Sequence, residues 1–154
     1  MNPDQPLPDT PCYCSSLRQA SRYVTAFYDQ MLSGSGLRVT QFAILARLRP
    51  GPAPVTRLAQ GMVMDRTTLA RNLQPLVREE LVRIRPSEHD RRERIVELTA
   101  SGRDKVEAIL PAWHRAQDLF DQQFGAERGA QLLATMRAVV GSGLHELGGA
   151  ATPD

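Results

Sequence analysis

The sequence predicts a mainly α-helical fold that carries one small β-hairpin. Apolar residues recur at three- and four-residue spacing over most of the 154-residue chain, which is typical of amphipathic helices. Between positions 81 and 98, in contrast, Val and Ile alternate with charged residues, as in half-exposed strands. Hydrophobic residues make up 42% of the chain and charged residues 23%, the composition of a folded globular protein. The length suits one compact domain.

Two helices are predicted in the first third of the chain. Apolar residues from Leu17 to Met31 keep helical spacing until the SGSG stretch at 33–36 interrupts the pattern. Thr40 is the expected N-cap of the second helix, because its hydroxyl could accept from a free backbone N–H. The proline-rich stretch 50–54 ends this helix, since proline donates no backbone hydrogen bond.

The next two helices are short and closely spaced. The third covers residues 55–62, and its expected inward residues are Leu58, Ala59 and Met62. After a tight connection, Asp65 is expected to cap the fourth helix, which begins at Arg66. Two helices joined so closely indicate a helix-turn-helix.

The fourth helix contains a proline within its apolar pattern. The expected buried residues are Leu69, Leu73, Leu76 and Val77. Pro75 would cost about 3 kcal/mol in an undistorted helix interior, so we expect a kink or a local 3₁₀ turn between Arg71 and Pro75. This limits the expected recognition surface to residues 66–72.

A hairpin and two long helices complete the predicted fold. The expected strands are 81–85 and 94–98, with a polar tip at 86–93. Thr99 to Gly102 opens a long helix that Pro111 would bend and Gly125 would end. Its expected apolar face is Val106, Ile109, Leu110, Trp113, Ala116, Phe120 and Phe124. The last helix carries Leu132, Met136, Val139, Val140, Leu144 and Leu147.

This order of elements is that of a winged helix-turn-helix with a helix-rich segment at either end. The winged lobe is expected at 37–102, and the apolar helices at 12–34 and 103–148 are expected to form a dimer. The four prolines of residues 1–11 predict a disordered arm, and 149–154 a disordered tail. The N-terminus resembles no signal peptide and no apolar run is long enough to cross a membrane, so we expect a cytoplasmic protein.

Basic charge is concentrated in the predicted winged lobe. Residues 57–94 hold nine arginines against six acids, a balance of +3, which leaves the rest of the chain at −1. Arginine pairs with guanine and asparagine with adenine in the major groove, and an arginine on the wing could enter a narrow minor groove. The expected partner is therefore double-stranded DNA. The candidate DNA-binding residues are Arg66, Thr67, Thr68, Arg71, Asn72, Asp90, Arg91, Arg92 and Arg94.

The stretches VTRLAQGMVMDRTTLARNLQPLVREELVRI (55–84) and DRRERIVELTASGR (90–103) resemble the multiple antibiotic resistance regulator (MarR) family. The resemblance extends over roughly residues 14–147, and its most specific part is the hairpin signature followed by LT-x-x-G. It implies a homodimer that binds a palindromic operator and is released by a small ligand or an oxidant. It further implies that residues 66–72 read bases, and that Asp90 positions Arg92 in the minor groove. Pro54 departs from the family pattern, because a capping residue usually precedes the third helix.

Two inputs are open for a regulator of this kind. Cys14 and Tyr28 match the positions of the reactive cysteine and its hydrogen-bonding tyrosine in the organic-hydroperoxide-sensing branch, although Val39 stands where that branch has a second tyrosine. A thiol at a helix N-terminus ionises more readily, and the alternative is that Cys12 and Cys14 are small, inert fillers at the dimer interface. The other input is a small aromatic or lipophilic effector. The residues that could line its cleft are Arg18, Arg22, Tyr23, Phe27, Trp113 and His114.

Two other classes of function compete with a DNA-binding regulator. A winged-helix module for protein contacts is the main alternative, and the clustered arginines speak against it. A thiol enzyme lacks a base, because no histidine is near either cysteine in sequence. Two cysteines and three scattered histidines fall short of a four-ligand metal set, so neither a metal nor another cofactor is expected.

Overall fold

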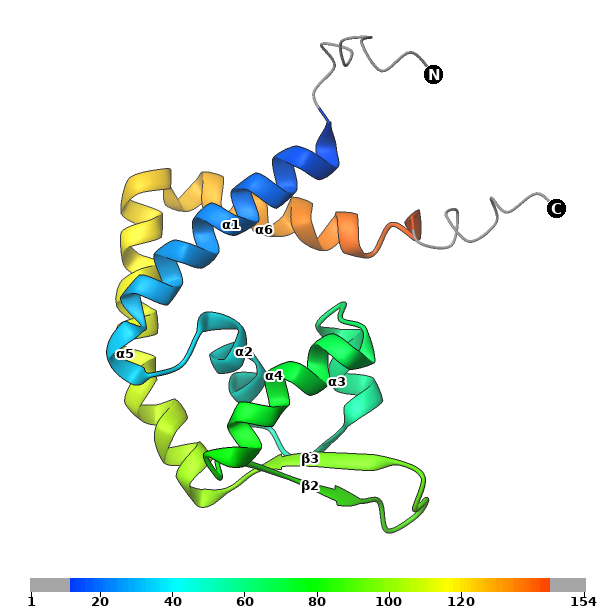
Figure 1. Cartoon of the computed structure of the whole chain (residues 1–154). Helices are drawn as coiled ribbons and strands as arrows, with labels where there is room; N and C mark the ends of the chain where they lie inside the picture. The colour runs from blue at the N-terminus through cyan, green and yellow to red at the C-terminus, as the bar shows by residue number, and fades with distance from the viewer. Residues whose placement is uncertain (1–11, 145–154) are drawn as a thin grey trace, which may run out of the picture. The chain divides into compact units, whose positions relative to one another are not determined.

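The computed structural model describes residues 12–144, and it confirms a mainly helical fold with a small antiparallel sheet (Figure 1). The helices are α1 (Tyr13–Met31), the 3₁₀ helix η1 (Ser33–Ser35), α2 (Val39–Arg47), α3 (Val55–Gly61), α4 (Arg66–Arg78), α5 (Ala100–Phe124) and α6 (Ala126–Val140). The strands are β1 (Ala53–Pro54), β2 (Val82–Pro86) and β3 (Arg94–Leu98). The predicted arm, the predicted tail and Leu147 lie outside the described residues.

The chain divides into two compact units rather than the single one expected. The first ends at Trp113 and the second begins at His114, so α5 contributes to both. The reason lies in the core, whose fully buried side chains come from residues 32–109. Within the described part of the second unit, only Ala116 and Gly129 are buried.

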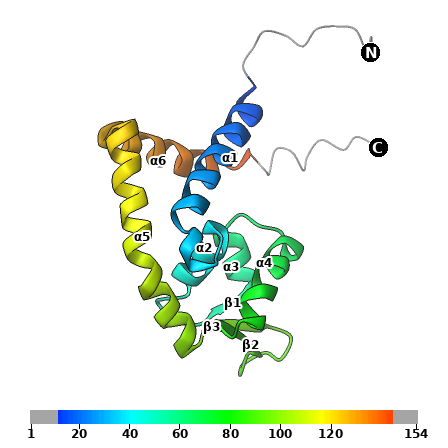
Figure 2. The same cartoon turned by 60° about the vertical axis from the view of Figure 1, so that its left-hand side comes forward.

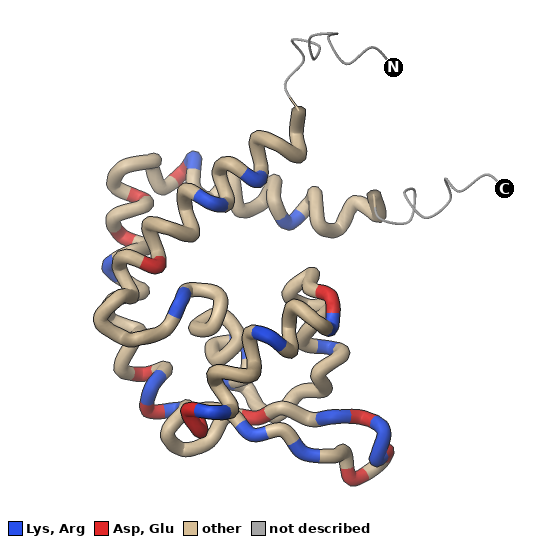
Figure 3. Tube along the Cα trace, viewed as in Figure 1, with Lys and Arg blue, Asp and Glu red and all other residues tan. Residues whose placement is uncertain are grey.

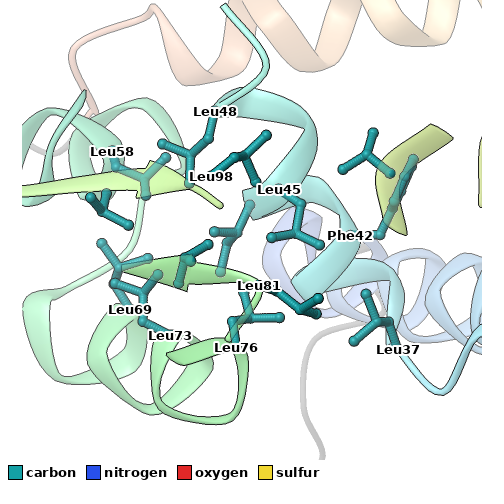
Figure 4. Packing of buried hydrophobic residues seen from close by; sticks show 14 of the residues in the cluster. Leu37, Phe42, Leu45, Leu48, Leu58, Leu69, Leu73, Leu76, Leu81 and Leu98 are labelled. Carbon is teal, nitrogen blue, oxygen red and sulfur yellow. The ribbon is translucent and has the colours of Figure 1, made fainter. Parts of the chain in front are cut away.

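The core of the first unit is built mainly from leucines. Side chains of α2, α4 and the sheet meet there, as Figure 4 shows for Leu45, Leu76 and Leu98. Each of these is at most 4% exposed. Burying a leucine of this kind contributes about 2 kcal/mol, so this cluster holds the helix-turn-helix against the sheet.

The sheet has three strands in the order β1-β3-β2, all antiparallel (Figure 2). The β2–β3 hairpin confirms the predicted one, and its register pairs Val82 with Leu98 and Arg83 with Glu97. Strand β1 was not predicted. It has only two residues, one of them a proline, within a stretch whose composition indicates a loop.

The prediction that Thr40 caps α2 is wrong. The helix begins at Val39 with Arg38 as its N-cap residue, so Thr40 lies inside it. The cap comes instead from α1, where Asp29 Oδ1 accepts a 2.7 Å hydrogen bond from the Val39 backbone N–H. The second Asp29 oxygen pairs with Arg38 at 3.2 Å, so a single carboxylate ties α1 to α2.

Helix α4 begins at Arg66 with Asp65 as its N-cap, as predicted. The structure corrects two other expectations for this helix, a local 3₁₀ turn before Pro75 and the burial of Val77. The residues around Pro75 are α-helical, which excludes the local 3₁₀ turn, while the kink stays a prediction. The leucine core under α4 offsets the hydrogen bond that proline cannot donate and the clash of its ring with the carbonyl one turn earlier. Val77 is 40% exposed, because it lies about 100° around the helix from the buried Leu76.

Helix α5 begins directly on the end of the wing. The Thr99 hydroxyl oxygen accepts from the Gly102 N–H at 2.9 Å, and the same hydroxyl lies 2.6 Å from the carbonyl oxygen of Glu80, to which it donates. A Cβ atom on Gly102 would lie 1.9 Å from the carbonyl oxygen of Leu81, so only glycine permits this approach. These contacts explain why the LT-x-x-G stretch opens the helix as predicted: its threonine accepts from the first turn, and its glycine lies against the Leu81 carbonyl.

The second unit consists of the end of α5 and all of α6. Gly125, with a φ of 95°, separates the two helices as predicted. Arg128 lies 4.6 Å from the centre of the Phe124 ring, and Phe124 packs against Phe120. The predicted last helix is interrupted, because α6 ends at Val140 with Gly141 as its C-cap, and Leu144 is helical again beyond this break.

Among the described helices, none is both long enough and apolar enough to cross a membrane.

Candidate nucleic-acid interface

The exposed side of α4 presents polar side chains that the protein leaves unpaired. Arg66, Thr67 and Arg71 are all exposed. Among the described residues, none makes a side-chain hydrogen bond or ion pair with these three. Their donors are therefore available to an external acceptor, and no internal contact has to be broken first.

Thr68 and Asn72 are held in a local network instead. Asp65 accepts from the Thr68 backbone N–H at 2.8 Å through Oδ1 and from the Thr68 hydroxyl at 2.7 Å through Oδ2. The hydrogen bond from the Thr68 side chain, followed by the one from its backbone, lowers the pKa of Asp65. Asn72 donates through Nδ2 to the Thr68 carbonyl at 2.9 Å.

This network restricts what each side chain can offer to a base. A hydroxyl has one proton, and that of Thr68 is used by Asp65, so the Thr68 oxygen can only accept from a base. Asn72 keeps one amide proton and its carbonyl oxygen, which is the pair of groups that matches adenine.

The wing tip is a closed turn that projects three arginines. The Ser87 N–H donates to the Glu93 carbonyl at 2.9 Å, and the Glu93 N–H donates to the Asp90 carbonyl at 2.9 Å. Arg91, Arg92 and Arg94 are exposed. Asp90 contacts Arg92, but through the Arg92 backbone N–H at 2.9 Å. In the described chain Asp90 therefore shapes the turn, and it makes no ion pair with the Arg92 guanidinium.

One acid in the wing was missed by sequence reasoning. Glu97 is only 9% exposed and forms ion pairs with Arg83 and Arg85, the latter at 3.4 Å. The hydrogen bond from Arg83, together with the positive charges of both arginines, lowers the pKa of Glu97 in spite of its burial. The cross-strand register that places Arg83 opposite Glu97 was the signal that could have revealed it.

Helix α4 carries three arginines and no acid, whereas the wing tip carries both arginines and acids, as the blue and red segments of the hairpin show (Figure 3). Two arginines of the wing strand β2 are already paired with Glu97, whereas Arg91, Arg92 and Arg94 are free of ion pairs within the described residues. The predicted DNA-binding residues thus fall into two groups in the first unit, one on α4 and one at the tip.

The candidate redox residues are far apart within one chain. Both Cys12 and Cys14 are exposed at the start of α1. Tyr28 is on the same helix, 14 residues after Cys14, which corresponds to about 21 Å along the axis. A Cys14–Tyr28 hydrogen bond is therefore excluded within one chain and would need a second copy.

The candidate effector residues come from α1 and α5. Arg18, Arg22 and Tyr23 are exposed on α1, and Phe27 packs edge-on against Tyr28 with ring centres 5.3 Å apart. These residues are in the first unit, as is Trp113. The Trp113 ring lies 6.4 Å from that of Phe42 and packs against the core, which gives Trp113 a structural role.

The described residues contain no cluster of three or more histidines, cysteines or acids that could hold a metal. His114 belongs to the second unit.

A helix-turn-helix followed by a basic hairpin defines a winged-helix DNA-binding transcriptional regulator. Residues 35–93 match the MarR family. The chain is 31% identical over 127 residues to the HTH-type transcriptional repressor NicR of Pseudomonas putida, covering 82% of this chain and 80% of NicR. The chain therefore belongs to the MarR family, which confirms the resemblance.

Solved structures share the fold. The M. tuberculosis regulator MosR, solved in complex with DNA, is 32% identical, with a TM-score of 0.71 and coverage of 84% of this chain and 98% of MosR. BpsR of Bordetella bronchiseptica is 22% identical, with a TM-score of 0.76 and coverage of 88% and 97%. The BpsR structure concerns regulation of its DNA binding by 6-hydroxynicotinic acid.

Proposed function

We propose that this protein is a homodimeric repressor that binds a palindromic operator and is released by a small ligand or by oxidation of Cys14. The observation that carries this proposal is the set of unpaired arginines on α4 and on the wing tip of one compact unit. A helix with free arginines fits the major groove, and a hairpin arginine fits the minor groove beside it.

Dimerisation is supported by helices that bury little within one chain. None of the 19 residues of α1 is buried, and Leu17 is 46% exposed. On α6, Leu133 and Val140 are 50% and 62% exposed. So much exposed apolar surface on two helices is typical of an interface between subunits. Two copies related by a twofold axis would read the two halves of a palindrome.

The test of DNA binding is a salt titration on the intergenic DNA beside the gene. Binding through phosphates releases counterions, so log K should fall steeply and linearly with log salt concentration. Arg92→Ala should weaken specific binding several-fold, while Arg103→Ala, an exposed arginine on α5, should leave it within about twofold. A flat salt dependence would refute DNA binding, and wild-type affinity in Arg92→Ala would remove the wing from the mechanism.

The dimer is tested by sedimentation. Leu133→Glu introduces a charge on the exposed apolar side of α6 and should shift the protein from dimer toward monomer. Gln131→Lys, on the same helix and polar already, is the control, because it adds a charge that attracts the neighbouring Glu127. A monomeric wild-type protein at micromolar concentration would contradict the proposal.

The two inputs are separated by one comparison. An organic hydroperoxide should release DNA from the wild type and from Cys12→Ser, but not from Cys14→Ser. Release that persists in Cys14→Ser would discard oxidation of this thiol. The second input, a small effector, is tested by adding a small heteroaromatic or aromatic acid without oxidant and measuring release of the DNA. The motivation is the likeness in fold to BpsR, whose DNA binding is regulated by 6-hydroxynicotinic acid.

A further inference from the structure

Helix α4 has a polar face that continues beyond the predicted recognition residues. Its buried residues Leu69, Leu73 and Leu76 follow the spacing i, i+4, i+7. Thr67, Arg71 and Gln74 repeat the same spacing two residues earlier. Two residues correspond to about 200° of rotation, so these three side chains lie opposite the core. We name them the outer face of α4.

Pro75 does not interrupt this face. The residues on both sides of it are α-helical as far as Arg78, and the Glu79 N–H donates to the Pro75 carbonyl at 2.9 Å. Gln74 therefore keeps the helical phase set by Thr67 and Arg71. Its side chain is exposed, and among the described residues no group accepts from it or donates to it.

We propose that Gln74 is a further base-reading residue of α4. This inference rests on the proposed function, because it requires that α4 enter the major groove. Gln74 follows Arg71 by three residues, about 4.5 Å along the helix axis, whereas successive base pairs are about 3.4 Å apart. Gln74 is thus spaced to read the base pair next to the one that Arg71 contacts.

The chemistry of the side chain selects the base. A carboxamide donates through nitrogen and accepts through oxygen, which matches N7 and the N6 amino group of adenine in the major groove. The contact ends with this residue. One turn later Arg78 has the same phase, but Glu79 and Glu80 follow it and bring two negative charges that oppose approach to phosphates.

The test compares base preferences. Operators are first selected from random DNA with the wild-type protein, and each position is then varied singly. In Gln74→Ala, preference for adenine at one position of each half-site should fall by roughly five- to a hundred-fold, with other positions unchanged. Gln122→Ala, an exposed glutamine on α5, should retain the wild-type profile.

A second variant keeps the size of the side chain. Gln74→Glu replaces the donor by an acceptor, so preference at the same position should move from adenine to cytosine, whose N4 amino group donates. Both variants should remain helical by circular dichroism, since alanine and glutamate favour helices. A wild-type profile in Gln74→Ala would overturn the role of Gln74 alone. Failure of the wild-type protein to select any sequence would instead overturn the proposed function and the inference together.

Discussion

Gly102→Ala should destabilise the junction between the wing and α5. The added Cβ would lie 1.9 Å from the Leu81 carbonyl oxygen, and relief to 3.0 Å needs a shift of about 1.1 Å. Such a shift weakens two hydrogen bonds of Thr99, one to the Leu81 carbonyl at 3.1 Å and one to Glu80 at 2.6 Å. Overpacking costs about 1–3 kcal/mol and each lost hydrogen bond about 1 kcal/mol, so the free energy of unfolding should fall by about 3–5 kcal/mol.

The measurement is urea unfolding followed by circular dichroism, together with thermal melting. A loss of this size corresponds to a decrease in Tm of roughly 6–20 °C for a chain of this length. Gly61→Ala is the matched control, because its Cβ would meet only the Arg47 guanidinium at an ordinary 3.5 Å. That change should stabilise α3 by up to about 1 kcal/mol. A Gly102→Ala protein within about 0.5 kcal/mol of wild type would refute the steric reasoning.

Three further predictions concern caps and backbone strain. Asp29→Ala removes the acceptor for the Val39 N–H and should cost about 1 kcal/mol of unfolding free energy in urea, while Asp29→Asn, which keeps an acceptor, should cost less. Val63 is β-branched at a φ of 52° and 71% exposed, so Val63→Gly should raise stability by up to about 1 kcal/mol, and a loss of stability would contradict strain there. The pKa of Asp65 is lowered in the folded protein, so the ionised carboxylate adds to the free energy of unfolding at neutral pH, which is above the pKa of about 3.9 in the unfolded chain. This added stability is lost as the pH falls through the pKa of the folded state. Urea unfolding from pH 7 to pH 3 should therefore show the difference between wild type and Asp65→Asn shrinking in acid; a constant difference would exclude this linkage.

Local signals in the sequence were enough to predict most of the fold. Leu69, Leu73 and Leu76 repeat at helical spacing, and Asp65 stands immediately before them as the cap. The hairpin strands alternate between apolar and charged residues over a few positions. Each of these features depends on residues that are close in sequence, so the sequence pattern was sufficient to predict the helix, its cap and the hairpin.

Features that depend on tertiary contacts could not be predicted in this way. Asp29 caps a helix that begins ten residues later, and Glu97 is buried only because the hairpin register brings Arg83 and Arg85 to it. That α4 remains helical through Pro75 also depends on tertiary contacts. A helix packed along its length on a leucine core offsets the loss of one hydrogen bond, which propensity alone does not reveal.

The count of nine arginines between residues 57 and 94 therefore overstates the charge available to DNA. Arg83 and Arg85 share the carboxylate of Glu97, so a phosphate would have to compete with an ion pair that is already formed and partly shielded from water. Arg66, Arg71 and the tip arginines have no such competitor among the described residues. Because each phosphate contact adds about 0.9 to the salt slope, an arginine that is already paired with an acid should add less to the slope than an unpaired one. Arg83→Ala should consequently change that slope less than Arg92→Ala, even though both side chains belong to the same hairpin.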